Sequence, residues 1–330
     1  MPLPIRLVKL LAKAVGIRKL VKAALLGPKR RRVGACRAAR FSARFAVEEW
    51  PVEDGWAETI RLAVPLRSID AADRPKAAPR RHIVFLHGGG YASEASPMHR
   101  LFLASLERRH GFLVTNVDYP LVPEHTAADT HRALLQAYRD VAARNPGDVF
   151  FLMGDSAGGG LALAFRQVLR DLAEEAARAG ASDDGAAPRP LPMPQACVLI
   201  SPWLDVTLSN PGLADDAARD PVLSVDGCVA AGLRYAGAID PKDPRVSPAF
   251  GRMEDLGSVL VFCGTEEVFR SDCVDLAARL DAARGSSCEI RVEEGMAHDW
   301  VLAPVREARA ARARIADFLR RFPDGIADAL

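Results

Sequence analysis

The chain has 330 residues, of which 49% are hydrophobic and 26% are charged, so it can bury a full core as one large α/β domain or as a domain with an appendage. The net charge of +2 is unevenly spread: residues 1–45 hold 13 Lys and Arg and no acid, and residues 46–330 carry a net charge of −11. Lys or Arg interrupts every apolar run of the basic segment, so we expect no secretory signal of the usual kind.

The basic segment is expected to form two short amphipathic helices, because its charged stripe shifts face near Gly16. We favour packing of these helices on the body beside its active site. Contact of residues 1–32 with an anionic membrane surface and a role as an organelle transit peptide are the alternatives. The expected location is cytoplasmic, with or without membrane association, and no nucleic-acid partner is expected.

Strand-like and helix-like segments alternate along the rest of the chain, which predicts a mainly parallel sheet with right-handed crossovers. Several of the apolar runs have almost no polar position, as strands covered on both faces require. A stretch rich in Gly, Pro and Asp, residues 179–194, predicts an exposed loop. The expected strands are 59–66, 82–86, 112–117, 148–153, 195–200, 258–263 and 287–292, and the expected helices are about 98–110, 127–144, 157–178, 270–284 and 304–321.

A candidate nucleophile lies between the expected strand 148–153 and the helix that follows it. The residues from Gly154 to Gly158 match GxSxG in the strand-to-helix context that this motif needs. The turn is sharp and strained, so its flanking positions must be small. It lifts the side chain of Ser156 clear of the backbone and points the N–H of Ala157 at the group that Ser156 attacks.

A Ser hydroxyl needs a base to remove its proton, and in this topology the order along the chain is Ser, acid, His. His298 is the only His after Ser156, so it is the candidate base. The acid should follow the strand 258–263. Glu266 or Glu267 is favoured there, because both lie just past the strand end, whereas Asp272 and Asp275 lie further along the chain.

The segment HGGG, His87 to Gly90, follows the expected strand 82–86. Three consecutive glycines let the backbone approach a substrate with its amides exposed, as an oxyanion hole requires. Phosphate binding is the alternative, but no Lys or Ser/Thr follows at the P-loop spacing. The six Cys have no CxxC spacing, which favours buried free thiols over disulfides or metal ligands.

Six motifs together resemble the hormone-sensitive lipase family of α/β-hydrolases, and they keep the family order from about residue 82 to 302. The resemblance implies an α/β-hydrolase fold with a mostly parallel eight-stranded sheet, flanked by helices and covered by a helical cap. The motifs are HGGGY (87–91), DYPLVPEH (118–125), GDSAGGG (154–160), SPWLD (201–205), DPRVSP (243–248) and GMAHDW (295–300).

The resemblance also assigns site residues. It implies an oxyanion hole made by Gly89, Gly90 and Ala157, and it implies Glu267 as the triad acid. A Glu here departs from the usual Asp of the family and leaves Glu266 and Asp272 as alternatives. No metal or cofactor is implied.

The implied catalytic domain spans residues 46–330. Its cap consists of residues 1–45 and an insertion at about 205–240. The implied function is a serine carboxylesterase that hydrolyses short-chain acyl or acetyl esters through an acyl-enzyme. Its implied partner is a small-molecule ester substrate. A homodimer is also possible by this resemblance, because family members often form one. The alternatives are an acyltransferase or amidase with the same triad, and a non-catalytic small-molecule receptor. The presence of His298 favours an enzyme.

Overall fold

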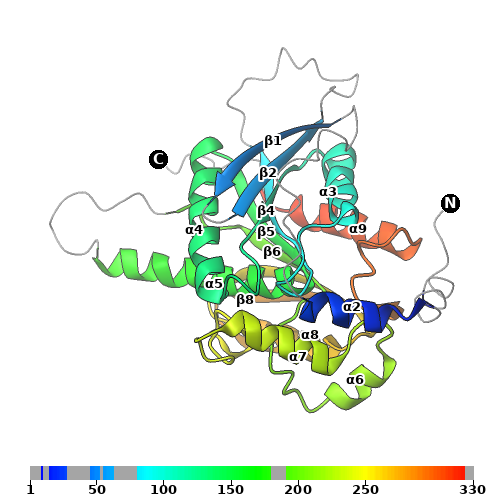
Figure 1. Cartoon of the computed structure of the whole chain (residues 1–330). Helices are drawn as coiled ribbons and strands as arrows, with labels where there is room; N and C mark the ends of the chain where they lie inside the picture. Colours follow the sequence, from blue (N-terminus) through cyan, green and yellow to red (C-terminus); the bar gives the residue numbers. More distant parts are fainter. Residues whose placement is uncertain are drawn as a thin grey trace.

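A computed structural model describes residues 9, 15–27, 45–52, 55–62, 80–179 and 191–323. One eight-stranded sheet, in the order β1-β2-β4-β3-β5-β6-β7-β8, runs through the middle of the molecule (Figure 1). β2 pairs antiparallel with β1 and with β4, and the other pairs are parallel. The strands are β1 (Phe45–Val52), β2 (Gly55–Leu62), β3 (Arg81–Leu86), β4 (Leu113–Asp118), β5 (Val149–Asp155), β6 (Ala196–Ile200), β7 (Gly257–Glu266) and β8 (Ser286–Ala297).

Helices cover both faces of the sheet, so the central strands are buried along their whole length: every residue of β5 and β6 is buried. One hydrophobic core joins the sheet to α4, α5, α7 and α8, and a second core joins it to α3 and α9. The helices are α2 (Ile17–Leu26), α3 (Pro97–His110), α4 (Ala127–Arg144), α5 (Ser156–Ala179), α6 (Leu213–Arg219), α7 (Val225–Ala236), α8 (Arg270–Ala282) and α9 (Glu307–Leu319), with a 3₁₀ turn at η2 (Pro248–Phe250).

The predicted fold class is confirmed, and six of the expected strands correspond to β3–β8. The seventh corresponds to β2, which begins earlier, at Gly55; residues 63–66 lie outside the described residues. β1 was not expected, because its sequence FAVEEWPV carries two Glu and a Pro and lacks a continuous apolar run. It lies at the edge of the sheet, where polar residues and Pro are tolerated.

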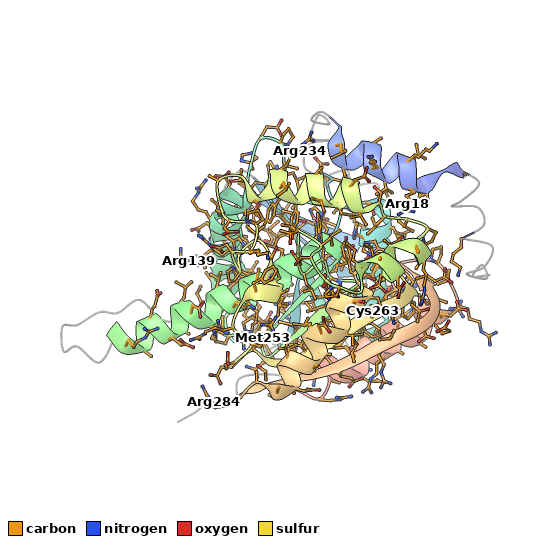
Figure 2. The ribbon with its side chains drawn as sticks, turned by 90° about the horizontal axis from the view of Figure 1, so that it is seen from below. Arg18, Arg139, Arg234, Met253, Cys263 and Arg284 are labelled. Atoms are coloured by element: carbon orange, nitrogen blue, oxygen red, sulfur yellow. The ribbon has the colours of Figure 1, made fainter. Side chains whose placement is uncertain are left out.

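The basic N-terminal segment is described only at Lys9 and from residue 15 to 27. α2 begins directly after Gly16, whose φ of 68° is in the left-handed region. The first of the two expected helices falls mostly on residues 1–8 and 10–14, which lie outside the described residues. α2 lies beside α7 in both views (Figure 1 and Figure 2). The guanidinium of Arg234 donates to the carbonyl of Leu26 at 3.0 Å.

The expected insertion at about 205–240 contains α6 and α7. Of the expected loop at 179–194, residues 180–190 lie outside the described residues. The Cys in the described ranges are free thiols; Cys197, Cys228, Cys263 and Cys273 are buried, as predicted, and Cys288 is half-buried. Among the described helices, none combines the length and the apolar character needed to cross a membrane.

Candidate active site

Ser156 stands on the sharp turn between β5 and α5. Its φ of 52° is in the left-handed region, a strained conformation for a residue other than glycine. The turn is so tight that a Cβ on Gly154 would lie 2.2 Å from the carbonyl oxygen of Gly158. A Cβ on Gly158 would lie 2.0 Å from the carbonyl oxygen of Leu86. The two glycines of the motif are therefore steric requirements of the turn.

The sequence-predicted triad residues come together at the ends of three strands. His298 directly follows β8, and its Nε2 lies 2.9 Å from Ser156 Oγ. Its Nδ1 faces Glu267 Oε2 at 3.8 Å, which is longer than a hydrogen bond. Such contacts are often long without substrate and tighten in the reacting complex. The carboxylate of Glu267 is fully buried, and burial raises its pKa against the lowering effect of His298 and Ser201.

The two alternative acids have other partners. Glu266 Oε1 accepts a hydrogen bond from Lys9 Nζ at 2.6 Å, in an ion pair at the partly exposed end of β7. Asp272 lies on α8 and accepts from the Asn210 amide at 2.9 Å. Glu267 is thus the acid that the geometry places beside the His298 ring.

Ser201 holds the Glu267 carboxylate, a role that the sequence analysis missed. Its hydroxyl donates to Glu267 Oε2 at 2.6 Å and accepts from the backbone N–H of Asp299 at 3.1 Å. It therefore connects the acid to the loop that carries His298. The available signal was the position of Ser201 in SPWLD, directly after β6 and at the same sheet edge as Ser156.

Asp299 is a second residue that the sequence analysis missed. Its Oδ2 lies 3.2 Å from His298 Nε2, the same nitrogen that faces Ser156. Burial lowers the pKa of His298, but the negative charges of Asp299 and Glu267 outweigh burial and raise it to about 9.

Burial also raises the pKa of Asp299, so Asp299 and His298 compete for one proton. We place this proton on the imidazole, because the ring then contacts carboxylates through both of its nitrogens.

The loop from His87 to Gly90 follows β3 and lies against the turn of Ser156. Gly88 N–H donates to Asp155 Oδ1 at 2.9 Å, and the other oxygen of Asp155 lies 2.9 Å from His99 Nε2. Asp155, the variable residue of GxSxG, therefore ties the glycine loop to the nucleophile turn. Burial alone would raise the pKa of Asp155, but its contacts with His99 and Gly88 hold it below the usual value.

Gly89 and Gly90 have φ values of 116° and 62°, which favour glycine. Within the described residues, neither N–H donates a hydrogen bond to another group. A Cβ on Gly90 would lie 2.1 Å from Leu25 Cδ2 of α2, so the N-terminal helix packs directly on this loop. Ala157 is the second residue of α5, where backbone N–H groups lack helical partners.

One group of side chains in the described residues has the types and spacing of metal ligands: single atoms of Cys263, Glu267 and Cys273 lie within 4.8 Å of one another. Zinc binds thiolates rather than thiols. Burial, followed by the contact with Cys263, raises the pKa of the Cys273 thiol well above its usual value. We therefore assign these thiols to the packing around Glu267.

Residues 83–302 match a family model described as "alpha/beta hydrolase fold". This chain belongs to that family. An esterase from Acinetobacter venetianus is 29% identical to this hydrolase over 251 residues, which cover 74% of this chain and 76% of the relative. An acetyl-hydrolase from Streptomyces hygroscopicus is 32% identical over 231 residues, which cover 69% and 70%.

The crystal structure of an esterase from the bacterial hormone-sensitive lipase family is also similar to this hydrolase. It has a TM-score of 0.72 and 25% identity, and the match covers 94% of this chain and 97% of that chain. The predicted resemblance to this family and the prediction of a hydrolase are confirmed. The relatives support a carboxylesterase as the broad activity.

Proposed function

We propose that this hydrolase is a serine carboxylesterase that cleaves short-chain acyl or acetyl esters through an acyl-enzyme. The observation that carries the proposal is the 2.9 Å contact between Ser156 Oγ and His298 Nε2, with the buried Glu267 on the opposite side of the ring. The relatives named esterase and acetyl-hydrolase support the same chemistry and favour a small acyl group.

In the first half of the reaction, Ser156 Oγ bonds to the ester carbonyl carbon while His298 takes the hydroxyl proton. The electron pair of the carbonyl moves to its oxygen. The N–H groups of Gly89, Gly90 and Ala157 would bind this oxyanion, since the first two have no partner among the described residues. His298 then returns the proton to the leaving alkoxide as the carbon–oxygen bond breaks.

In the second half, His298 takes a proton from water, and the resulting hydroxide attacks the acyl carbon. The second tetrahedral intermediate collapses, the acid leaves, and Ser156 Oγ receives the proton back. Glu267 stabilises the imidazolium in both halves. Ser201 fixes the carboxylate for this task through its 2.6 Å hydrogen bond.

We further propose that α2, α6 and α7 form a cap over the site. Leu25 of α2 is buried against Gly90 of the glycine loop, and Lys22 of α2 pairs with Asp226 of α7. These contacts support packing of the basic segment on the body beside the active site. Membrane contact and dimer formation stay predictions.

Hydrolysis of p-nitrophenyl esters from acetate to laurate by the purified protein tests the proposal. We expect turnover to peak on short chains and to fall at least a thousandfold in Ser156→Ala and in His298→Ala. Ser258→Ala and His125→Ala are matched controls outside the site and should keep full activity. Folded protein that turns over none of these esters, or a Ser156→Ala variant as active as the wild type, would contradict the proposal.

The two alternatives separate in the same assay. The close contact of Ser156 with His298 favours turnover over a receptor that only binds ligand. Acyl transfer is tested by adding an alcohol such as methanol and measuring the ratio of methyl ester to free acid. A ratio far above that set by the methanol and water concentrations would identify a transferase.

A further inference from the structure

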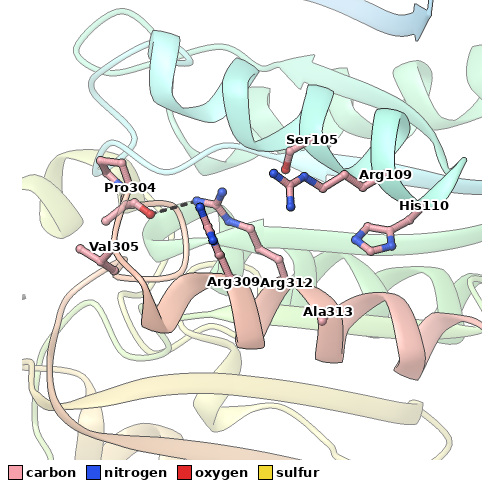
Figure 3. A pocket seen from close by; sticks show the side chains of 9 residues that line it. Ser105, Arg109, His110, Pro304, Val305, Arg309, Arg312 and Ala313 are labelled. Atoms are coloured by element: carbon pink, nitrogen blue, oxygen red, sulfur yellow. Dashed lines mark hydrogen bonds between the residues drawn. The ribbon is translucent and has the colours of Figure 1, made fainter. Parts of the chain in front are cut away.

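A basic groove lies between α3 and α9, on the sheet face opposite to α4 and α5 (Figure 3). It is a cavity of about 410 Å³, and its lining includes three Arg, one His and no Asp or Glu. Arg109 and His110 come from the end of α3, and Arg309 and Arg312 come from α9. We call these four residues, together with the hydroxyl-bearing Ser105, the basic groove.

Two of the guanidinium groups in the basic groove have no hydrogen-bond or ion-pair partner among the described residues. Within the described residues, no hydrogen bond or ion pair involves the side chains of Arg109 and Arg309, although most other Arg of the body pair with a carboxylate or a carbonyl. Burial lowers the pKa of Arg312, and the positive charge of Arg109 lowers it further. Like charges that face one another without an acid favour the binding of an anion.

Arg312 is already held in place. Its Nε donates to the carbonyl of Val301 at 2.9 Å, and its Nη2 donates to the carbonyls of Leu302 and Ala303 at 2.8 and 3.0 Å. The guanidinium also lies 5.4 Å from the ring centre of Phe102. These contacts use Nε and Nη2, which leaves the two N–H donors of Nη1 for a ligand on a guanidinium that is already held in place.

His110 contributes a neutral ring to the groove and not a fourth positive charge beside its three Arg. Burial and the positive charges of Arg320 and Arg109 lower its pKa, and the smaller effect of Asp317 only partly opposes them. In the neutral ring Nδ1 accepts a hydrogen bond from the guanidinium of Arg320, so Nε2 carries the proton and can donate to a ligand. Arg320 Nη2 lies 3.3 Å from this Nδ1, and Arg320 Nη1 lies 3.8 Å from Asp317 Oδ1, so the charge of Arg320 is already paired with an acid.

We propose that the basic groove binds the phosphate group of an anionic ligand. Guanidinium forks match the oxygens of a phosphate, and the charge of a phosphate dianion suits several cations better than the single charge of a carboxylate does. The cavity of about 410 Å³ is larger than a phosphate group alone, so the ligand also carries an organic body. A soluble phosphomonoester and a phospholipid headgroup share this chemistry.

Calorimetric titration of the whole protein with inorganic phosphate tests the proposal. The test variant is Arg109→Gln/Arg309→Gln. Its matched control, Arg108→Gln/Arg139→Gln, removes the same number of charges from exposed helix positions outside the groove. We expect the test variant to bind phosphate at least tenfold more weakly than the wild type and the control variant to bind it as the wild type does. Ester hydrolysis by both variants should stay at the wild-type rate, which shows that they are folded.

Co-sedimentation with vesicles of phosphatidylglycerol, compared with phosphatidylcholine alone, distinguishes the two sources of phosphate. Binding to the anionic vesicles that is lost only in the test variant identifies a lipid headgroup. Phosphate binding without such vesicle binding identifies a soluble phosphorylated ligand. No calorimetric binding of phosphate to the wild type, or equal weakening in the test and control variants, would overturn the proposal.

Discussion

Replacing Asp299 by Asn tests where the proton of the active site lies at neutral pH. Asp299 Oδ2 is 3.2 Å from His298 Nε2, and its φ of 57° is one that Asp and Asn both tolerate better than most residues. The substitution therefore removes the charge and leaves the shape and the backbone unchanged. We expect the pKa of His298 to fall in the variant.

The size of the effect follows from the raised pKa of His298. With a pKa of about 9 in the wild type, only about 1% of His298 is neutral at pH 7 and able to accept the proton of Ser156. An adjacent carboxylate shifts a pKa by about 1 to 3 units, so its loss should raise the neutral fraction at pH 7 about 10- to 90-fold. Above the wild-type pKa the two enzymes should differ little.

The assay is the pH dependence of kcat/KM for p-nitrophenyl butyrate from pH 5 to 10. The wild-type profile should rise through about pH 9, since the neutral imidazole is the active form and appears as the pH exceeds the pKa of His298. The profile of Asp299→Asn should rise at least one unit lower. NMR titration of labelled imidazole rings gives the same pKa without turnover, and Asp226→Asn, at an exposed position on α7, is the control.

A wild-type profile that already reaches its plateau near pH 7, or a variant with an unchanged midpoint, would refute the reasoning. Asp299 would then carry the proton itself and exert no charge on the ring.

Three further substitutions test the other contacts of the site. Glu267→Gln should lower kcat about 10³- to 10⁴-fold, because the imidazolium loses its buried counter-charge. The control Glu266→Gln should change kcat less than about threefold. If steady-state kinetics gave the reverse order, the triad acid would be Glu266. Leu25→Ala should cost about 2–3 kcal/mol of packing energy between α2 and the glycine loop, and it should lower kcat/KM. The control Leu20→Ala, at a residue that is 54% exposed, should have a smaller effect. If both variants changed activity and the proteolysis of α2 equally, Leu25 would not hold α2 on the glycine loop. Gly158→Ala should lower the free energy of unfolding in urea by about 3 kcal/mol, because the new Cβ would lie 2.0 Å from the Leu86 carbonyl oxygen. An unchanged urea midpoint of unfolding would show that the turn can widen.

The strands that sequence analysis predicted best are those that bury both faces. β5 and β6 have no exposed residue, and their sequences have an almost continuous apolar run. β1 was missed because an edge strand needs no such run. The positions of Ser156 and His298 were predictable because the order of strands brings their carboxyl ends to one edge.

The contacts of Asp299 and Ser201 were not predictable in the same way. Asp299 is adjacent to His298 in sequence, but the direction of its carboxylate depends on a backbone φ of 57°, which no composition or periodicity signals. Ser201 touches Glu267 across 66 residues of chain, so its hydrogen bond depends on strand order and on the register of β6 with β7. Tertiary packing, and not local sequence, decides both contacts.

The uneven charge of the chain has a structural counterpart in the N-terminal segment. Lys9 pairs with Glu266 and donates to the carbonyl of Gly295 at 3.1 Å, and Lys22 pairs with Asp226, so two bases of the segment meet acids of the body. Exposed ion pairs contribute little to stability and are screened by salt. Burial of Leu25 against Gly90 is a contact that salt does not weaken. The charges therefore favour the correct placement of the segment, and the apolar contact holds it at the glycine loop.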